Sequence, residues 1–210
     1  MSREAIHDKN DPVIIGVDCA RFGDNDTVIF TRIGNDGRSF GFERYNGLDS
    51  TQIAERVIDV IQRLNNLGKR VSGLFIDGGG LGAGPVDILR RLGYAPVDVN
   101  FGNRASDRKY RRKVDEMWGR MKDGLYSGLA LPRDNDLKAQ LTQREYSITD
   151  TGLIALESKK IMLERVNKSP DIADAIALTY HSDVNRDMPD NLFGYLPKVE
   201  SEWDPLKIDW

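Results

Sequence analysis

The sequence predicts an α/β fold with a mixed central sheet flanked by helices. Short apolar runs rich in Val and Ile alternate with segments whose apolar residues recur at helical spacing. The first three runs are separated only by turns, so they are expected to pair as antiparallel strands. The later runs are separated by helical segments, which is the connection that parallel strands need.

Five strands are expected in the main sheet. The first, beginning VIIGV, is expected to be buried on both faces because its apolar residues are continuous. A turn rich in Asn, Asp and Gly over 34–37 predicts a hairpin between the second and third strands. The sequence Asp150-Thr151-Gly152 predicts a second, inserted hairpin. The main strands are expected at 13–19, 26–33, 39–45, 71–76 and 96–99, and the hairpin strands at 146–149 and 153–157.

Helices are expected where apolar residues recur every three or four positions. Ser50 is the expected cap of the first helix, and Ser169-Pro170-Asp171 is a strong start signal for the last. A continuous apolar stripe over 106–126 predicts one long helix. The expected helices are 50–64, 85–92, 106–126, a stretch with Leu137 and Leu141, a short helix at Lys159-Lys160, and 170–183. This succession fits a ribonuclease-H-like order, with the first strand central and the fourth parallel beside it.

Composition restricts the class of protein. With 210 residues, 30% of them charged, and a net charge of −3, the chain suits one domain without an overall excess of charge. It lacks an apolar stretch of bilayer-spanning or signal-peptide type, so a soluble intracellular protein is expected. The single cysteine, Cys19, excludes an internal disulfide and a cysteine-based zinc cluster. We divide the chain into an N-terminal extension (1–11), one domain (12–184) and a C-terminal tail (185–210).

Four aspartates occupy positions from which they are expected to meet. Asp18 ends the first strand and Asp77 the fourth, so adjacent parallel strands would place both at the sheet edge where open α/β folds bind ligands. Asp171 and Asp174 are three positions apart and share one helix face. Asp171 is also explained as a helix-start acid favoured by the dipole. Asp174 interrupts the apolar run IADAIAL, where a carboxylate needs a compensating partner.

Converging carboxylates repel one another, and hard divalent cations relieve the repulsion. Ligands that are all oxygen favour Mg²⁺ or Mn²⁺, and two such ions about 3.5–4 Å apart promote phosphodiester cleavage. The convergence of these carboxylates therefore predicts a site for two such ions, with Asp18, Asp77 and Asp174 as candidate ligands and Asp171 as either a further ligand or a helix-start acid. His181 lies two turns beyond Asp174 and is better explained as a helix-end residue than as a ligand.

A basic cluster within an otherwise slightly acidic chain points to a polyanionic substrate. Such a cluster is by default a solvated helix face, but it can also neutralise DNA phosphates without reading bases. Two lysines beside the inserted hairpin extend it. The candidate DNA-binding residues are Arg104, Arg108, Lys109, Arg111, Arg112, Lys113, Lys159 and Lys160.

Three pieces of the chain, in order, carry a resemblance to a known family. They are IIGVDCARFGDNDT, LFIDGGGLGAGPVDILRRLG, and ESKK with SPDIADAIALTYH. Over roughly residues 12 to 183 the chain resembles the nuclease domain of the large terminase subunit of tailed double-stranded-DNA bacteriophages, in the ribonuclease-H-like superfamily. By this similarity Asp18, Asp77 and Asp174 correspond to the family's metal-binding acids, with Asp171 as a fourth. The last piece also resembles the acidic helix of Holliday-junction resolvases.

The resemblance implies a role in viral genome packaging. In that family the domain cuts concatemeric double-stranded viral DNA in the host cytoplasm. It works with the portal protein and the small terminase subunit, and it is fused to an N-terminal packaging ATPase. This sequence has no G-x-x-x-x-G-K-[ST], so no ATP-binding residues are expected and the chain is interpreted as an isolated nuclease domain. The acidic, aromatic tail is expected to dock on the portal, and no membrane is expected as a partner.

Two other functions remain open from the sequence. An actin- or sugar-kinase-type ATPase also begins with a strand ending in Asp and has a second Asp-Gly-Gly-Gly turn, but its duplicated fold needs a much longer chain. A non-catalytic module that binds DNA or the portal would share the basic cluster without the chemistry. The nuclease accounts for the most residues, because it alone explains Asp174 and the basic cluster together.

Overall fold

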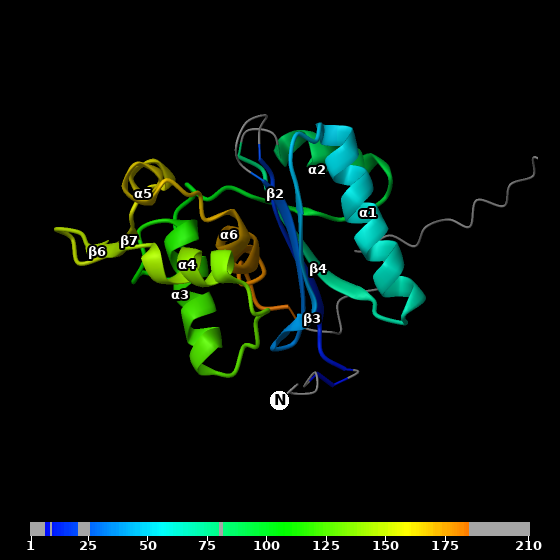
Figure 1. Ribbon diagram of the computed structural model, residues 1–210, viewed down its shortest axis with the longest axis horizontal. Helices are drawn as coiled ribbons and strands as arrows, with labels where there is room; N and C mark the ends of the chain where they lie inside the picture. The colour runs from blue at the N-terminus through cyan, green and yellow to red at the C-terminus, as the bar shows by residue number, and fades with distance from the viewer. Residues whose placement is uncertain (1–6, 9, 21–25, 80–81, 185–210) are drawn as a thin grey trace, which may run out of the picture.

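A five-stranded mixed sheet lies between two layers of helices (Figure 1). The computed structural model describes residues 7–8, 10–20, 26–79 and 82–184. In this part of the chain the strand order is β3-β2-β1-β4-β5, so the first strand is central, as predicted. The strands are β1 (Val13–Asp18), β2 (Thr27–Ile33), β3 (Asp36–Tyr45), β4 (Val71–Asp77) and β5 (Val97–Val99). The expected ribonuclease-H-like arrangement is confirmed.

The strand pairing decides where the chemistry-bearing residues emerge. β1 pairs antiparallel with β2, and β2 antiparallel with β3. β4 lies parallel to β1, with Val17 opposite Ile76, and β5 lies parallel to β4. Since Asp18 and Asp77 each follow one of these paired residues, they leave the sheet side by side at the same edge.

Two helices, α1 (Ser50–Asn66) and α2 (Ala83–Arg91), cover one face of the sheet (Figure 1). Alternate residues of β1, among them Ile15 and Val17, are fully buried against them because successive side chains of a strand point to opposite faces. The cap of α1 is Asp49 rather than the expected Ser50. The Asp49 carboxylate accepts from the Gln52 N–H at 2.8 Å, and the Gln52 side chain accepts from the Asp49 N–H, so Ser50 is already in the first turn.

The other face is covered by helices from the C-terminal half of the chain (Figure 1). The helices in this half are α3 (Lys113–Tyr126), α4 (Asn135–Gln143), α5 (Lys159–Val166) and α6 (Asp171–Leu178). All eight residues of α6 are buried, and it lies directly on β1. A Cβ at Gly16 would lie only 2.1 Å from the Ala175 carbonyl oxygen, so this close approach requires glycine.

The long helix expected over 106–126 begins only at Lys113, and this part of the prediction is wrong. Residues 104–112, which we call the basic loop, instead run beside the inserted hairpin of β6 (Tyr146–Ile148) and β7 (Ile154–Leu156). The Arg111 N–H donates to the Ile154 carbonyl at 3.0 Å, and the Ile154 N–H donates to the Lys109 carbonyl at 2.8 Å. These hydrogen bonds to the hairpin replace the helical ones.

The last helix is also shorter than expected. It ends at Leu178, and the following residues form tighter turns, in which the N–H groups of Thr179, Tyr180 and His181 donate to carbonyls three positions earlier. Among the described residues no helix is long and apolar enough to cross a membrane. The expected tail, 185–210, and most of the expected extension lie outside the described residues.

Candidate active site

Four aspartates from three elements meet at one edge of the sheet. Asp18 closes β1, Asp77 closes β4, and Asp171 and Asp174 lie in the first turn of α6. Asp18 is 3% exposed and Asp174 is fully buried. Asp77 is close enough to act electrostatically on Asp18 and to be acted on by Asp174. We call these four residues the acidic cluster; the sequence predicted all of its members.

Lys159, the first residue of α5, carries the cation that balances the acidic cluster. Its Nζ lies 3.1 Å from Asp18 Oδ2, 2.9 Å from Asp174 Oδ2 and 3.9 Å from Asp171 Oδ1. The ring of Phe101 lies 5.6 Å from the same ammonium. Lys159 was predicted to contact DNA, but its ammonium lies between the carboxylates of Asp18 and Asp174.

Asp174 is held on one side by two donors from other helices. Its Oδ1 accepts from Trp118 Nε1 on α3 at 2.7 Å and from Arg144 Nη1, at the end of α4, at 2.7 Å. Its Oδ2 is buried and faces the Lys159 ammonium at 2.9 Å. One carboxylate oxygen is therefore engaged by Trp118 and Arg144, and the other by Lys159.

Asp77 and Asp171 are positioned mainly by local structure. The Gly79 N–H donates to Asp77 Oδ1 at 2.9 Å. A Cβ at Gly82 would lie 1.6 Å from the Asp77 carbonyl oxygen, so the turn after β4 requires glycine there. Asp171 accepts from the Asp26 N–H at 3.3 Å and from the Ser169 hydroxyl, which ties the start of α6 to the loop after β1.

The electrostatics of the acidic cluster favour a bound cation. Burial, reinforced by the neighbouring carboxylates, raises the pKa of Asp18 well above its usual range even though Lys159 opposes it. Burial also raises the pKa of Asp77 and of Asp171. Burial opposes ionisation of Asp174 too, but Lys159 and Arg144 outweigh it and hold that pKa below the ordinary value. Burial by itself would lower the pKa of Lys159, but Asp174 and Asp18 outweigh it. The net effect is a raised pKa, so the ammonium stays charged.

The residues of the acidic cluster fit a hard divalent cation that would replace the Lys159 ammonium. Within the described residues, no group of three or more Asp, Glu, His or Cys side chains forms a ready-made metal cage. The Lys159 ammonium sits between the oxygens of Asp18 and Asp174. The donor set is nevertheless all oxygen, and the buried Asp174 Oδ2 already faces a cation, the Lys159 ammonium, at 2.9 Å. This is the ligand chemistry that Mg²⁺ and Mn²⁺ prefer.

The predicted basic cluster divides into exposed and engaged residues. Arg104, Arg108, Lys109 and Arg111 lie exposed on the basic loop. Arg112 instead pairs with Asp115 at 2.9 Å and donates to the Leu156 carbonyl. Lys113 is buried and pairs with Glu116 at 3.1 Å. Lys160 is exposed, with Glu164 at 3.9 Å. The structure thus places Arg112 and Lys113 in the packing of α3 and not on the exposed basic surface.

His181 and Cys19, which the sequence did not favour as ligand or nucleophile, are both partly buried in the fold. The ring of His181 packs against Phe75 with centroids 5.1 Å apart, and burial, aided by Lys113, lowers its pKa to about 4. His181 follows the C-terminal end of α6, whereas the acidic cluster is at its start. Burial raises the pKa of the Cys19 thiol, and Asp18 and Asp77 add to this, so the thiol stays protonated.

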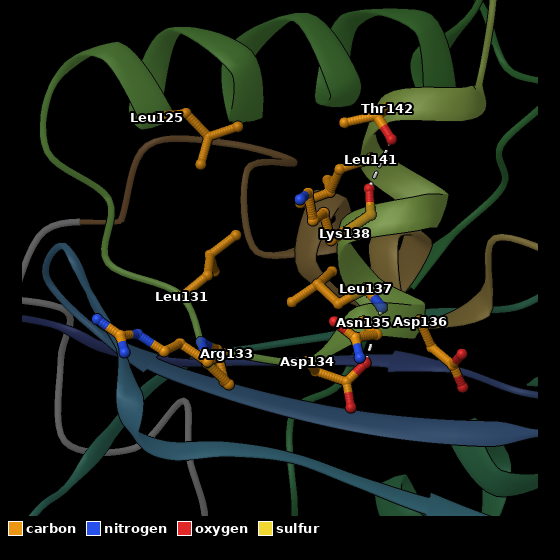
Figure 2. Close-up of a pocket in the computed structure, with 11 residues that line it drawn as sticks. Leu125, Leu131, Arg133, Asp134, Asn135, Asp136, Leu137, Lys138, Leu141 and Thr142 are labelled. Carbon is orange, nitrogen blue, oxygen red and sulfur yellow. Dashed lines mark hydrogen bonds between the residues drawn. The ribbon is translucent and has the colours of Figure 1, made fainter.

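A hollow of about 880 Å³ lies apart from the acidic cluster, between α4 and the chain around Leu131. Figure 2 shows Leu125 and Leu131 on one side of it and the side chains of α4, among them Leu137, Lys138 and Leu141, on the other. No member of the acidic cluster lines it. The hollow is therefore separate from the acidic cluster.

Sequence reasoning missed two residues that contact the acidic cluster. Trp118 was interpreted only as part of an apolar helical stripe, which its ring does occupy. Its indole N–H, a donor that needs a partner when buried, was the available signal. Arg144 gave no signal, since a single arginine before a hairpin is ordinary. Its side chain is only 3% exposed, which became visible only in the fold.

No family model and no curated protein sequence matches the chain. Several solved structures do. The nuclease domain of the large terminase subunit gp2 of bacterial virus Sf6 is 18% identical, with a TM-score of 0.67, over 82% of this chain and 89% of that one. The large terminase nuclease of thermophilic phage G20c is 15% identical, with a TM-score of 0.60, over 83% of each chain. That of Thermus phage P74-26 is 15% identical, with a TM-score of 0.57, over 83% of this chain and 80% of that one. The chain therefore has the ribonuclease-H-like fold of the large terminase nuclease domains.

Proposed function

We propose that this chain is a Mg²⁺- or Mn²⁺-dependent endonuclease that cuts concatemeric double-stranded DNA during phage genome packaging. The observation that carries the proposal is the acidic cluster, four carboxylates brought to one sheet edge, three of which lie within 3.9 Å of the Lys159 ammonium. The fold shared with large terminase nuclease domains supports it. The Sf6 domain has been solved with manganese and the G20c domain with magnesium, which supports the choice of cation.

In this proposal the acidic cluster holds the metal ions and the basic loop holds the DNA. Two bound ions supply an activated water and stabilise the leaving 3′-oxygen. Asp18, Asp77 and Asp174 provide the oxygen ligands, with Asp171 as the fourth acid. The exposed cations of the basic loop contact DNA phosphates. This placement is favourable because the loop begins beside Phe101, which touches Lys159, and pairs with β7, which leads to Lys159.

The remaining assignments extend this proposal to the packaging complex. Residues 12–184 form the nuclease domain, and 185–210 form a tail that docks on the portal protein. The partners are the portal, the small terminase subunit and a packaging ATPase, in the host cytoplasm. Unchanged portal binding after deletion of residues 190–210 would contradict the role of the tail.

A second candidate is a non-catalytic DNA-binding module. The observation that favours it is the Lys159 ammonium, which already satisfies the charge of the acidic cluster in part. The two candidates differ in one respect, since only the nuclease needs a divalent cation. An actin-type ATPase has no comparable support in the structure.

A plasmid-nicking assay tests the proposal. The wild-type chain is incubated with supercoiled DNA in Mn²⁺, Mg²⁺ or EDTA, beside Asp18→Asn and the matched control Asp87→Asn. Asp87 is an exposed carboxylate on α2, on the opposite side of the sheet. We expect metal-dependent cutting by the wild type and Asp87→Asn, and a loss of at least about 100-fold in Asp18→Asn, since changes outside the ligands alone cost about 10–100-fold. Cutting by Asp18→Asn at the wild-type rate would refute the metal assignment. DNA binding that is the same in EDTA as in Mn²⁺ or Mg²⁺, without cutting under any condition, would favour the second candidate.

A further inference from the structure

Three helices that are distant in sequence meet at one oxygen atom of the acidic cluster. Asp174 on α6 accepts at Oδ1 from Trp118 on α3 and from Arg144 at the end of α4, each at 2.7 Å. The Asp174 carboxylate is completely buried, and the Arg144 side chain is 3% exposed. Water therefore does not take the place of either donor.

The two donors also support each other. The guanidinium carbon of Arg144 lies 4.6 Å from the centroid of the Trp118 ring, so the cation stacks on the indole while both groups reach the same oxygen. The planar guanidinium and the rigid indole leave the carboxylate little freedom to rotate. A carboxylate fixed in this way points its second oxygen in one direction.

That second oxygen is the one directed at the remaining acids. Asp174 Oδ2 faces the Lys159 ammonium at 2.9 Å, and this same ammonium lies 3.1 Å from Asp18 Oδ2. Helices α3 and α4 thus engage one oxygen of Asp174, and the other oxygen meets a cation, which is Lys159 in this structure. Outer partners of this kind orient metal ligands, and losing them costs about 10–100-fold in metal affinity.

We propose that Trp118 and Arg144 are positioning residues for Asp174, which fix its Oδ1 so that Oδ2 is presented to the metal ion. The inference rests on the proposed metal-dependent function and adds to it two residues that touch neither metal nor DNA. It predicts that removing the indole N–H alone, without removing a charge or a ligand, weakens metal binding.

The experiment measures Mn²⁺ binding directly, in the absence of DNA, by the electron paramagnetic resonance signal of free Mn²⁺. Trp118→Phe removes the donor and keeps an aromatic ring in the core. The matched control is Tyr180→Phe, which removes a buried hydroxyl without a hydrogen-bond partner from a residue packed against the same core layer. We expect Trp118→Phe to raise the Kd for Mn²⁺ by about 10–100-fold. Tyr180→Phe should leave the Kd unchanged.

A second variant and a spectroscopic signature keep the test independent of folding. Arg144→Lys retains the charge but loses the planar guanidinium, and it should also weaken Mn²⁺ binding. In the wild-type chain, the nuclear magnetic resonance signal of the Trp118 indole N–H, identified by its absence in Trp118→Phe, should move when Mg²⁺ is added, because a cation at Oδ2 changes the acceptor strength of Oδ1.

The outcomes separate this inference from the function on which it rests. If the wild type binds Mn²⁺ and both Trp118→Phe and Arg144→Lys bind it equally well, the positioning role is overturned while the nuclease proposal stands. An indole signal that stays fixed as Mg²⁺ saturates the wild type would also overturn it. If the wild type itself binds no Mn²⁺, the proposed function fails and the positioning role with it.

Discussion

At the residue scale, Lys159 decides the state of the acidic cluster in the absence of metal. Its ammonium contacts Asp18, Asp171 and Asp174, so one positive charge stands among several buried negative ones. An ammonium balances charge but cannot activate a water molecule as a metal ion does. Under the proposed function, Lys159 and divalent cations therefore compete for the same oxygens.

This competition makes Lys159→Met a direct test of the charge balance. Without metal, the variant leaves buried carboxylates uncompensated, and we expect the free energy of unfolding to fall by about 1–3 kcal/mol. This is less than the roughly 3–5 kcal/mol for a broken buried pair, because the Lys159 side chain is 38% exposed. Urea unfolding in EDTA and in Mn²⁺ measures both states, and Mn²⁺ should stabilise Lys159→Met more than the wild type.

The neighbouring residue supplies the control for that measurement. Lys160 is 85% exposed and lies outside the acidic cluster, so Lys160→Met should leave the unfolding free energy and its response to Mn²⁺ unchanged. Equal behaviour of the Lys159 and Lys160 variants would show that the Lys159 ammonium does not balance the cluster.

His181 gives a second residue-scale prediction, on the dependence of stability on pH. Burial lowers its pKa to about 4 in the fold, whereas an unfolded histidine titrates near about 6.5. Between these values the unfolded chain binds more protons, so stability present at pH 7 is lost as the pH falls from about 6.5 to about 4. His181→Gln cannot take up this proton and should show a flatter dependence in denaturant unfolding. Parallel curves for the two proteins over that interval would contradict the assignment.

At the scale of elements, the contact between β1 and α6 brings Asp18 and Asp174 together. The Cβ that alanine adds at Gly16 would meet the Ala175 carbonyl at 2.1 Å, so Gly16→Ala must push α6 from the sheet. We expect a loss of at least about 1–3 kcal/mol in unfolding free energy. The plasmid assay should also show a loss of cleavage, because Asp174 moves with the helix.

An exposed glycine provides the comparison for this variant. At Gly102 the nearest atom to an added Cβ is the side-chain oxygen of Asn100 at 3.2 Å, which can move aside. Gly102→Ala should therefore keep both stability and cleavage. If Gly16→Ala behaves like Gly102→Ala, the close packing of α6 on β1 does not control the site.

Elements also show where prediction from sequence succeeded and failed. Asp18 and Asp77 could be placed together because strand ends and parallel pairing follow from local patterns. The start of α3 could not be predicted, because the apolar spacing around Tyr110 suits a helix equally well. The hydrogen bonds of the basic loop to Ile154, over forty residues later in the sequence, decide it. The inward position of Lys159 likewise depends on contacts with residues distant in sequence, such as Asp18.

At the scale of the whole molecule, the proposed function requires a local basic surface on a slightly acidic chain. We propose the exposed residues of the basic loop for this surface, and Arg90 and Arg91 on α2 lie in the opposite helical layer. Arg108→Ala/Arg111→Ala should lower the slope of log affinity against log salt by about 1.8, since each phosphate contact contributes about 0.9. The measurement is DNA binding in EDTA over a range of salt concentrations.

The charge-matched control is Arg90→Ala/Arg91→Ala, which removes the same net charge from the other layer. Its salt slope should equal that of the wild type. Equal slopes for both double variants would indicate that DNA responds to net charge alone and does not contact the basic loop.

The acidic cluster is built from the two ends of the described chain, with Asp18 on the first strand and Asp174 on the last helix. During synthesis on the ribosome, the first strand emerges long before the helix that completes the site. Under the proposed function, a nascent chain therefore cannot cut DNA until α6 has been translated. A fragment that stops before α6 lacks Asp171 and Asp174, so premature termination would yield no partially active nuclease.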